Sequence, residues 1–405
     1  MPKGRKCQPS KTLYNLTATL LLLGVAAFSQ GRQHPAQPVS QTNLPLKNCW
    51  NFSPAKIDGS QIASDNDQVY LPLDDGKLIA LDARTGLLVW QTEFGGQSKN
   101  TLYAFNDDLF VISEVKFGSA ANTAKTGDKN TAGFTENYII RRLDKRTGIV
   151  FWQQKIPEKI PEKTPDGGDR SDTRFYLYLT ADKLFAATSG GDFYTFDALD
   201  GKLEGMTFLR SEISAPPFFK GEQVFFGAAD KRILSLSLND SSKIFERRIL
   251  TRPTTIVVIG NNLVWGDAQG GVTSERILLK SRRKNWELRT GGEILNVTAV
   301  KENLLIASLD NYIYSVEEKS GKILWKKRLS NRPAFTALII DGTAVLTTVG
   351  DSTAVIAEIE SGRTINKINF GDNVFFSGSP QNLPSIIIFP TTAGIFAVTT
   401  GKNCE

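Results

Sequence analysis

The sequence predicts an all-β protein: an eight-bladed β-propeller of four-stranded antiparallel blades, with the ring closed by the N-terminal strand. Two observations predict this fold. A phrase made of a strand, a small-residue turn and a second strand recurs about every forty residues, which suits the four short strands of one blade. Within the phrase, apolar and polar residues alternate with the period of half-buried strands, and no long segment has helical spacing.

The phrase is clearest in three copies: LIALDARTGLLVW at 78–90, YIIRRLDKRTGIVFW at 138–152 and YIYSVEEKSGKILW at 312–325. Numbering each copy by the second residue of its turn gives eight positions. They are Gly86, Gly148, Gly201, Ser242, Arg282, Gly321, Gly362 and Gly401. Five of the seven gaps lie close to forty residues, and the two longer ones require insertions.

Tryptophan recurs four residues after the turn position. It stands there at Trp90, Trp152, Trp286 and Trp325. A large flat ring at a fixed place in the outer strand can pack between blades, so we expect these residues and Trp50 to dock neighbouring blades. Copies 3, 4 and 7 carry Gly205, Glu246 and Asn366 at that place, which predicts looser contacts there.

The last copy ends at residue 405, before a fourth strand could form. Residues 48–53, which include Trp50, are predicted to complete the blade that begins near residue 374. This closure brings Cys49 and Cys404 side by side, and an exported protein meets an oxidising compartment. We therefore expect a Cys49–Cys404 disulfide, the alternative being two unpaired buried thiols.

Two polar insertions interrupt the repeat. Residues 116–137 lie between the second and third strands of the second blade, and residues 157–172 lie between the second and third blades. In an up-and-down blade, loops after the second and fourth strands leave on one face, so both should form one rim. The rim is either a partner-binding surface or a tolerated elaboration. Its candidate contact residues are Lys116, Phe117, Phe134, Lys159, Lys163, Asp166 and Arg170.

The N-terminal region predicts export. Residues 1–29 combine a basic start with an apolar stretch at 16–28 and small residues before Gln30, as in a cleaved signal peptide, although an uncleaved membrane anchor is the alternative. Residues 30–47, rich in Gln and Pro, indicate a flexible linker before a propeller at 48–405. We expect a monomer in the periplasm or at the cell surface, touching the membrane only if the N-terminal segment is kept.

The charge balance and the lack of known site motifs argue against nucleic-acid binding and against a catalytic or metal site. Excluding the four basic residues of the first 29, the chain has 44 basic and 42 acidic residues, which gives no reason to expect nucleic-acid binding. The single histidine, His34, lies in the linker. Phosphate-binding loops, nucleophile elbows and calcium loops are absent from the sequence. The sequence therefore predicts no catalytic, cofactor-binding or metal-binding residues.

The first copy, from Asp75-Gly76 through Thr85-Gly86 to Trp90, resembles the D-G-x-L-x-A-L-D-x-x-T-G-x-x-x-W repeat of PQQ-like propellers. One branch of that family, the quinoprotein dehydrogenases, carries an adjacent cysteine pair that this chain lacks. The non-catalytic branch includes the BamB-like accessory component of outer-membrane protein assembly. Its members typically carry a lipobox cysteine, so a stand-alone exported scaffold is also compatible with this chain.

The resemblance implies a non-enzymatic scaffold that binds protein partners in the cell envelope, accessory to outer-membrane or envelope protein assembly, without a cofactor. The alternative is a divergent quinoprotein-type enzyme that binds PQQ or a small ligand in the axial channel.

Overall fold

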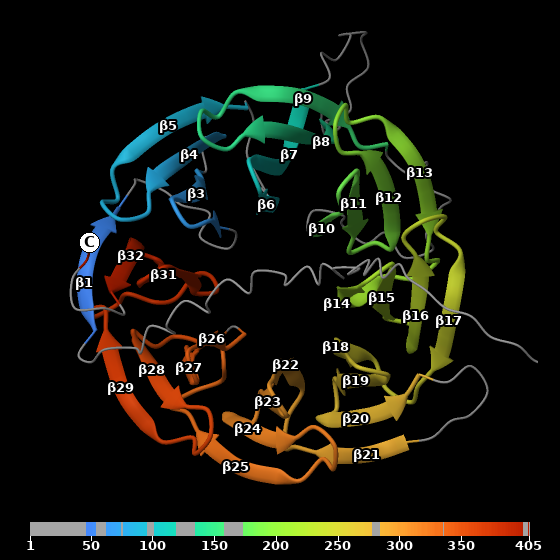
Figure 1. The fold of residues 1–405 in the computed structure, drawn as a ribbon, viewed down its shortest axis with the longest axis vertical. Helices are drawn as coiled ribbons and strands as arrows, with labels where there is room; N and C mark the ends of the chain where they lie inside the picture. Colours follow the sequence, from blue (N-terminus) through green and yellow to red (C-terminus); the bar gives the residue numbers. More distant parts are fainter. Residues whose placement is uncertain are drawn as a thin grey trace, which may run out of the picture. The chain divides into compact units, whose positions relative to one another are not determined.

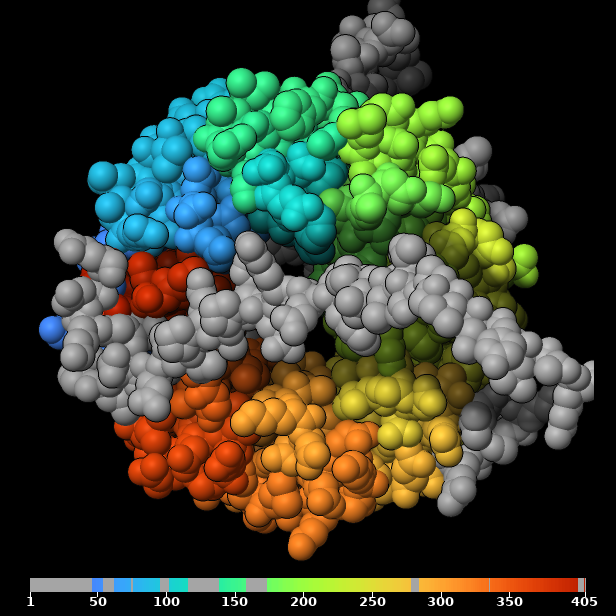
Figure 2. Space-filling model, viewed as in Figure 1, coloured from blue at the N-terminus to red at the C-terminus, as the bar shows by residue number. Residues whose placement is uncertain are grey.

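The computed structural model describes residues 46–53, 62–73, 76–94, 101–118, 134–157, 173–277, 284–334, 336–399 and 404. Every regular element in these ranges is a β-strand, and the strands form eight four-stranded sheets. The sheets stand as blades around a central axis (Figure 1), and neighbouring blades adjoin in the space-filling view (Figure 2). The all-β class and the eight four-stranded blades are therefore confirmed.

Blades 1 to 7 are built alike. Consecutive strands pair antiparallel, with the first strand nearest the axis and the fourth on the outer wall (Figure 1). Blades 1 to 4 consist of β2 (Ala63–Ser64), β3 (Gln68–Pro72), β4 (Lys77–Asp82) and β5 (Leu88–Glu93); β6 (Thr101–Phe105), β7 (Asp108–Gly118), β8 (Phe134–Asp144) and β9 (Val150–Lys155); β10 (Phe175–Leu179), β11 (Lys183–Thr188), β12 (Asp192–Asp197) and β13 (Leu203–Phe208); and β14 (Ile213–Lys220), β15 (Gln223–Ala228), β16 (Arg232–Ser237) and β17 (Lys243–Arg248).

Blades 5 to 7 consist of β18 (Pro253–Ile259), β19 (Asn262–Asp267), β20 (Gly271–Arg276) and β21 (Lys284–Arg289); β22 (Ile294–Val300), β23 (Asn303–Ser308), β24 (Tyr312–Glu317) and β25 (Ile323–Arg328); and β26 (Leu338–Ile340), β27 (Thr343–Leu346), β28 (Thr353–Glu358) and β29 (Thr364–Asn369).

Blade 8 joins the two ends of the chain. Its inner strands are β30 (Gln381–Leu383), β31 (Ile386–Thr391) and β32 (Gly394–Thr399), and its outer strand is β1 (Lys47–Phe52). Trp50 of β1 lies opposite Ala397 of β32. The ring is thus closed by the N-terminal strand, as predicted, and this closure pairs an edge that would otherwise stay open.

In blades 1 to 3 the chain turns sharply between the third and fourth strands, and an aspartate side chain stabilises the turn. In blade 1, Asp82 Oδ1 accepts hydrogen bonds from the backbone amides of Arg84 and Thr85 at 3.1 and 2.8 Å. The Gly86 amide donates to the Asp82 carbonyl oxygen at 2.8 Å, and Gly86 has φ +70°. Glycine reaches this left-handed conformation without a steric penalty, which explains the D-x-x-T-G phrase.

The hydrophobic core lies between the faces of adjacent blades. The middle strands carry most of it, and the core residues of β15 and β19, such as Phe226 and Val264, are fully buried. One core cluster joins Phe185 and Phe193 of blade 3 to Phe226 of blade 4. Each blade therefore depends on its neighbours for burial of its apolar faces.

Blade 2 differs from the sequence-based expectation. Residues 116–137 were predicted to be a polar loop, but β7 continues to Gly118 and β8 begins at Phe134, so that both strands span 11 residues. The added pairs include Phe117 with Thr135 and Gly118 with Phe134. Pairing satisfies backbone groups that a loop would leave to water, and aromatic residues favour strands. The insertion is therefore partly an extension of the β7–β8 hairpin.

Candidate partner-binding surface

Tryptophans in the outer strands dock neighbouring blades at five of the eight junctions. Buried Trp90 of β5 donates a hydrogen bond from Nε1 to the Lys145 carbonyl oxygen of blade 2, at 2.9 Å. Its ring lies so close to Gly148 that a Cβ atom there would stand 2.5 Å from Trp90 Cε3. The same two contacts recur at four other blade junctions. They join Trp50 to Ala83 and Gly86, Trp152 to Ala198 and Gly201, Trp286 to Glu318 and Gly321, and Trp325 to Ile359 and Gly362.

Trp and Gly change together at the junction between blades 3 and 4. Gly205 of β13 stands opposite Thr195, the place that Trp90 occupies opposite Ala80 in blade 1. The corresponding turn of blade 4 carries Ser241 at φ +57° instead of glycine. A Cβ atom is tolerated there because no indole ring lies over the turn. The five tryptophans therefore have a structural role in blade docking.

Blade 4 is shifted by one residue from the register predicted by sequence. Ser241, not Ser242, holds the left-handed turn position, and its amide donates to the Ser237 carbonyl oxygen. Phe245 consequently takes the docking place opposite Ser235, and it is buried with Trp265 between blades 4 and 5. The assignment of Glu246 to that place was wrong. It was made by counting four residues from the turn position, and the sequence does not show which of two adjacent serines adopts the left-handed conformation.

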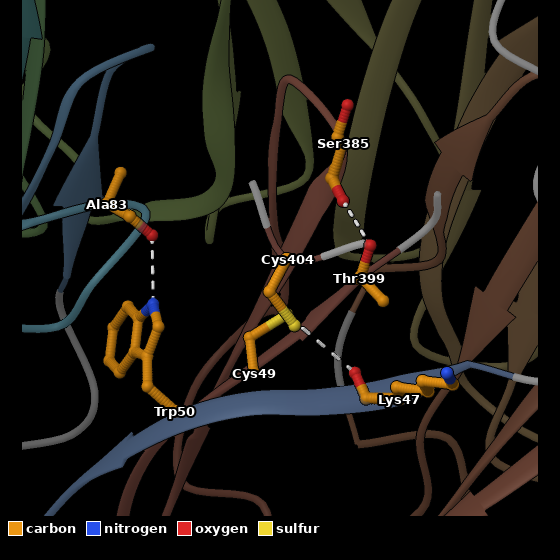
Figure 3. Close-up of a disulfide and its surroundings, with 7 residues drawn as sticks. All are labelled: Lys47, Cys49, Trp50, Ala83, Ser385, Thr399 and Cys404. Carbon is orange, nitrogen blue, oxygen red and sulfur yellow. Dashed lines mark hydrogen bonds between the residues drawn. A yellow bond between two sulfur atoms is a disulfide. The ribbon is translucent and has the colours of Figure 1, made fainter. Parts of the chain in front are cut away.

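Cys49 and Cys404 form a disulfide, with their Cα atoms 5.4 Å apart (Figure 3). On the same strand, Trp50 Nε1 donates to the Ala83 carbonyl oxygen of blade 1 at 3.0 Å. The strand that closes the ring is thus held covalently to the C-terminal end and by a tryptophan dock to the next blade. Neither contact leaves a reactive group available for chemistry.

The predicted rim residues fall in two groups. Lys116 and Phe117 belong to β7 and Phe134 to β8, where the structure describes the backbone and its pairing. The other four lie outside the described residues. They are Lys159, Lys163, Asp166 and Arg170. The structure thus places the first three on one extended hairpin of blade 2 and leaves the rim as a prediction.

The outer edges of blades 1 and 2 expose a series of apolar side chains that the sequence analysis missed. Leu87 precedes β5, which begins with Leu88 and Val89, and Ile149 precedes β9, which begins with Val150 and Phe151. Leu87 and Ile149 are 68% and 63% exposed. We call these six residues the apolar edge. Because Gly148 packs against Trp90, the two halves of the apolar edge lie at adjoining blades.

A sequence signal for the apolar edge was present. Six copies of the repeat have a lysine or arginine at or next to the position that follows the turn residue, where copies 1 and 2 have Leu87 and Ile149. The basic residues are Lys202, Lys243, Arg283, Lys322, Arg363 and Lys402. Charged residues, lysine above all, discourage pairing of an open sheet edge with another chain. Blades 1 and 2 therefore lack a protection that the other copies carry.

The outer strands also differ in charge. β1, β5, β9, β13 and β29 each contain one charged residue, whereas β17 (KIFERR), β21 (KNWELR) and β25 (ILWKKR) contain four, three and three. The outer wall of the ring is thus highly charged at blades 4 to 6 and weakly charged at the other five blades. Blades 1 and 2 combine this low charge with the apolar edge, a combination that suits contact with an uncharged, extended segment.

Arg142 holds the apolar edge at blade 2. Its guanidinium group lies over the Phe151 ring, 5.2 Å from the ring centroid. Nε donates to Asp108 Oδ1 at 2.8 Å, and Nη1 donates to the Leu199 carbonyl oxygen of blade 3 at 3.2 Å. These contacts keep the exposed ring of Phe151 in a defined orientation.

An ion pair links the two blades of the apolar edge near its turns. Asp65 of blade 1 lies 3.0 Å from Lys145 Nζ of blade 2 and accepts a hydrogen bond from Tyr70 OH at 2.8 Å. Burial alone would raise the pKa of Asp65, but hydrogen bonds from the Asp67 and Gln68 amides, Lys145 and Tyr70 together lower it. The Asp65 carboxylate is therefore stabilised in its charged form at the junction.

Among the described residues, no group of three or more His, Cys, Asp or Glu side chains is placed to hold a metal ion. Within the same part of the chain, no helix is long and apolar enough to cross a membrane.

Comparison with known proteins shows the family. The model of the PQQ_2 family, described as outer membrane protein assembly factor BamB, matches residues 39–131 and 136–288. This chain belongs to that family. A curated relative, outer membrane protein assembly factor BamB from Shewanella oneidensis, is 20% identical over 300 residues, which cover 71% of this chain and 68% of the relative.

Solved structures support the same fold. BamB from Moraxella catarrhalis aligns with a TM-score of 0.63 at 15% identity, over 89% of this chain and 98% of that one. The computationally designed Ika8 protein aligns with a TM-score of 0.64 at 16% identity, over 87% of this chain and 98% of the design. A designed protein with a similar score shows that the fold alone does not specify a function.

Proposed function

We propose that this chain is an exported, non-enzymatic scaffold that binds protein partners and assists assembly of proteins in the outer membrane. Membership of the BamB family and the relative named as an assembly factor support the process. The observation that carries the binding role is the apolar edge, where two neighbouring blades present open strands without the basic residue found in the other copies.

The apolar edge suits a partner segment in extended conformation. An outer strand offers a row of free backbone amides and carbonyls, which a partner strand can pair with. Leu88, Val89, Val150 and Phe151 lie on β5 and β9 and supply apolar contact to alternate side chains of such a segment. Strands of outer-membrane barrels alternate apolar and polar residues, so they have the pattern that this surface would accept.

Restoring the missing basic residues tests this role. Leu87→Lys with Ile149→Lys gives blades 1 and 2 the residue type of the other copies, and both positions are exposed, so folding should be preserved. We expect capture of the partner from an envelope extract to fall at least tenfold. The matched control is Ile244→Lys with Leu324→Lys, two exposed apolar residues on blades 4 and 6, which should leave capture unchanged.

The predicted rim is tested in parallel by deleting residues 119–133, beyond the last β7–β8 pair. Unchanged capture by the lysine variant, together with loss of capture in the deletion, would reject the apolar edge and favour the rim. Loss of capture in all variants, the control included, would reject both surfaces as specific sites. Equal thermal unfolding curves for all variants are required for either conclusion.

Export and the domain limits are part of the same proposal. A signal peptide at 1–29 and a linker at 30–47 would give a mature protein beginning at Gln30. N-terminal sequencing of the protein purified from the envelope tests this. A mature chain that retains Met1, or that begins upstream of the apolar stretch, would support the uncleaved anchor instead.

A further inference from the structure

A polar depression lies at the junction of blades 5 and 6, on the face that carries the turns between first and second and between third and fourth strands. It has a volume of about 580 Å³. Its lining consists of three cationic and three amide side chains: Arg276, Lys284, Lys319, Asn261, Asn262 and Asn285. No carboxylate is among the lining residues. We call it the blade 5–6 depression.

Its charge departs from the rest of the repeat at two positions. The last residue of the third strand is acidic in five blades, whereas blade 5 has Arg276. The five residues are Asp82, Asp144, Asp197, Glu317 and Glu358. The second position lies in the turn between the first and second strands. There, one residue accepts a backbone hydrogen bond from the residue that follows the third strand. This accepting residue is acidic in five blades, whereas blade 5 has Asn261. Those residues are Asp67, Asp107, Asp182, Glu222 and Glu302.

The neighbouring carboxylates leave two cations available. Glu287 pairs with Lys284 at 2.5 Å, and Glu318 accepts a hydrogen bond from Asn262 Nδ2 at 2.9 Å. Neither Arg276 nor Lys319 forms an ion pair with another residue of the described ranges.

The depression is built on fixed elements. Asn285 Nδ2 donates to Asn262 Oδ1 and Ser274 Oγ at 3.0 and 3.1 Å, which ties three strands of blade 5 together. The turn that carries Lys319 is held by Trp286, whose Nε1 donates to the Glu318 carbonyl oxygen at 2.7 Å. The cations are thus anchored on strand ends and on a docked turn, which limits the entropy lost on binding.

We propose that the blade 5–6 depression binds a phosphate-bearing anion. Arginine offers paired donors that match phosphate oxygens, lysine adds a mobile charge, and the amides supply further hydrogen bonds. A concave site lined by one sign of charge also concentrates anions of the opposite sign. The phosphate could belong to a soluble phosphate compound or to a lipid headgroup. This site is separate from the apolar edge, and it does not depend on the proposed function.

The test measures binding of inorganic pyrophosphate by calorimetry, and of vesicles of phosphatidylglycerol or phosphatidylcholine by co-sedimentation, at low ionic strength. We expect wild-type protein to bind pyrophosphate, phosphatidylglycerol vesicles, or both, and Arg276→Gln with Lys319→Gln to weaken that binding at least tenfold. Pyrophosphate binding assigns a soluble ligand, and binding to phosphatidylglycerol alone assigns a lipid headgroup. Both side chains are exposed, so the variant should keep the wild-type unfolding temperature.

The matched control is Arg84→Gln with Lys202→Gln, which removes the same charges from exposed turns of blades 1 and 3 on the same face. It should bind like the wild type. Equal weakening in the control would show attraction by overall charge and overturn the site, as would the absence of pyrophosphate and phosphatidylglycerol binding by the wild type. The partner-capture experiment is unaffected by either result.

Discussion

Replacing Gly148 by alanine tests the contact that docks blade 1 on blade 2. The added methyl group would stand 2.5 Å from Trp90 Cε3, and the backbone at φ +72° is itself unfavourable for an L-residue. The left-handed backbone costs about 1–2 kcal/mol, and overpacking a filled site costs about 1–3 kcal/mol. We therefore expect Gly148→Ala to lower the free energy of unfolding by about 2–5 kcal/mol.

Gly221→Ala separates the two contributions. Gly221 also has a positive φ, +55°, but a Cβ atom there would have no neighbour within 4 Å. This control should show the backbone cost alone, about 1–2 kcal/mol. The excess loss in Gly148→Ala then measures the conflict with the indole ring.

A double-mutant cycle identifies Trp90 as the partner in that conflict. Trp90→Ala removes a buried ring and its hydrogen bond to Lys145, which should cost about 3–5 kcal/mol. In the double variant the new methyl group no longer meets the ring, so the combined loss should fall short of the sum by about 1–3 kcal/mol. Urea unfolding followed by circular dichroism measures all four proteins. Additive losses, or equal losses in the two glycine variants, would refute the docking argument.

Three further predictions concern stability. Removing the Cys49–Cys404 disulfide should lower the free energy of unfolding by up to about 6 kcal/mol in the chain-entropy model for a loop of this length, measured by denaturation with and without reductant; unchanged stability would contradict it. The pKa of Asp65 in the folded protein lies below its usual 3.8. The stabilisation of the fold by the Asp65 carboxylate is therefore complete above pH 3.8 and is lost as the pH falls through the lower folded-state pKa. The stability difference between wild type and Asp65→Asn should therefore be constant at neutral pH and shrink in acid, and a difference that grows in acid would refute the sign. Phe245→Ala should lower the free energy of unfolding by about 3–5 kcal/mol, and Glu246→Ala should lower it by under about 1 kcal/mol. The reverse order would instead support the register of blade 4 that was predicted from the sequence.

Most of the fold could be predicted from the repeat, because its turn residues and its tryptophans recur at fixed spacing. Gly148 and Trp90 are strong signals, since few other residues satisfy a left-handed turn or an indole-sized space. Ser241 is a weak signal, because serine is common in turns of every kind. The error at Glu246 therefore arose in blade 4, whose turn lacks the glycine and whose outer strand lacks the tryptophan.

The candidate surfaces were harder to predict, because they depend on side chains that meet across blades. Leu87 and Ile149 follow the recurrent turn of the repeat. That they replace a basic residue becomes clear only when all eight copies are compared at that position. The Asp65–Lys145 pair and the convergence of Arg276 with Lys319 join residues from different blades. Spacing along one chain does not specify such pairings, whereas the packing of neighbouring blades does.

Closure of the ring by β1 has a consequence for biogenesis. A ribosome delivers Trp50 and its strand early, but β32, with which that strand pairs, is among the last segments to be synthesised. Until then the first strand has no sheet to join, and the open blade 8 presents an unpaired edge that invites association with other chains. Completion of the ring is therefore a late, non-local step, and a chain shortened by its last blade would leave its very first strand without a place.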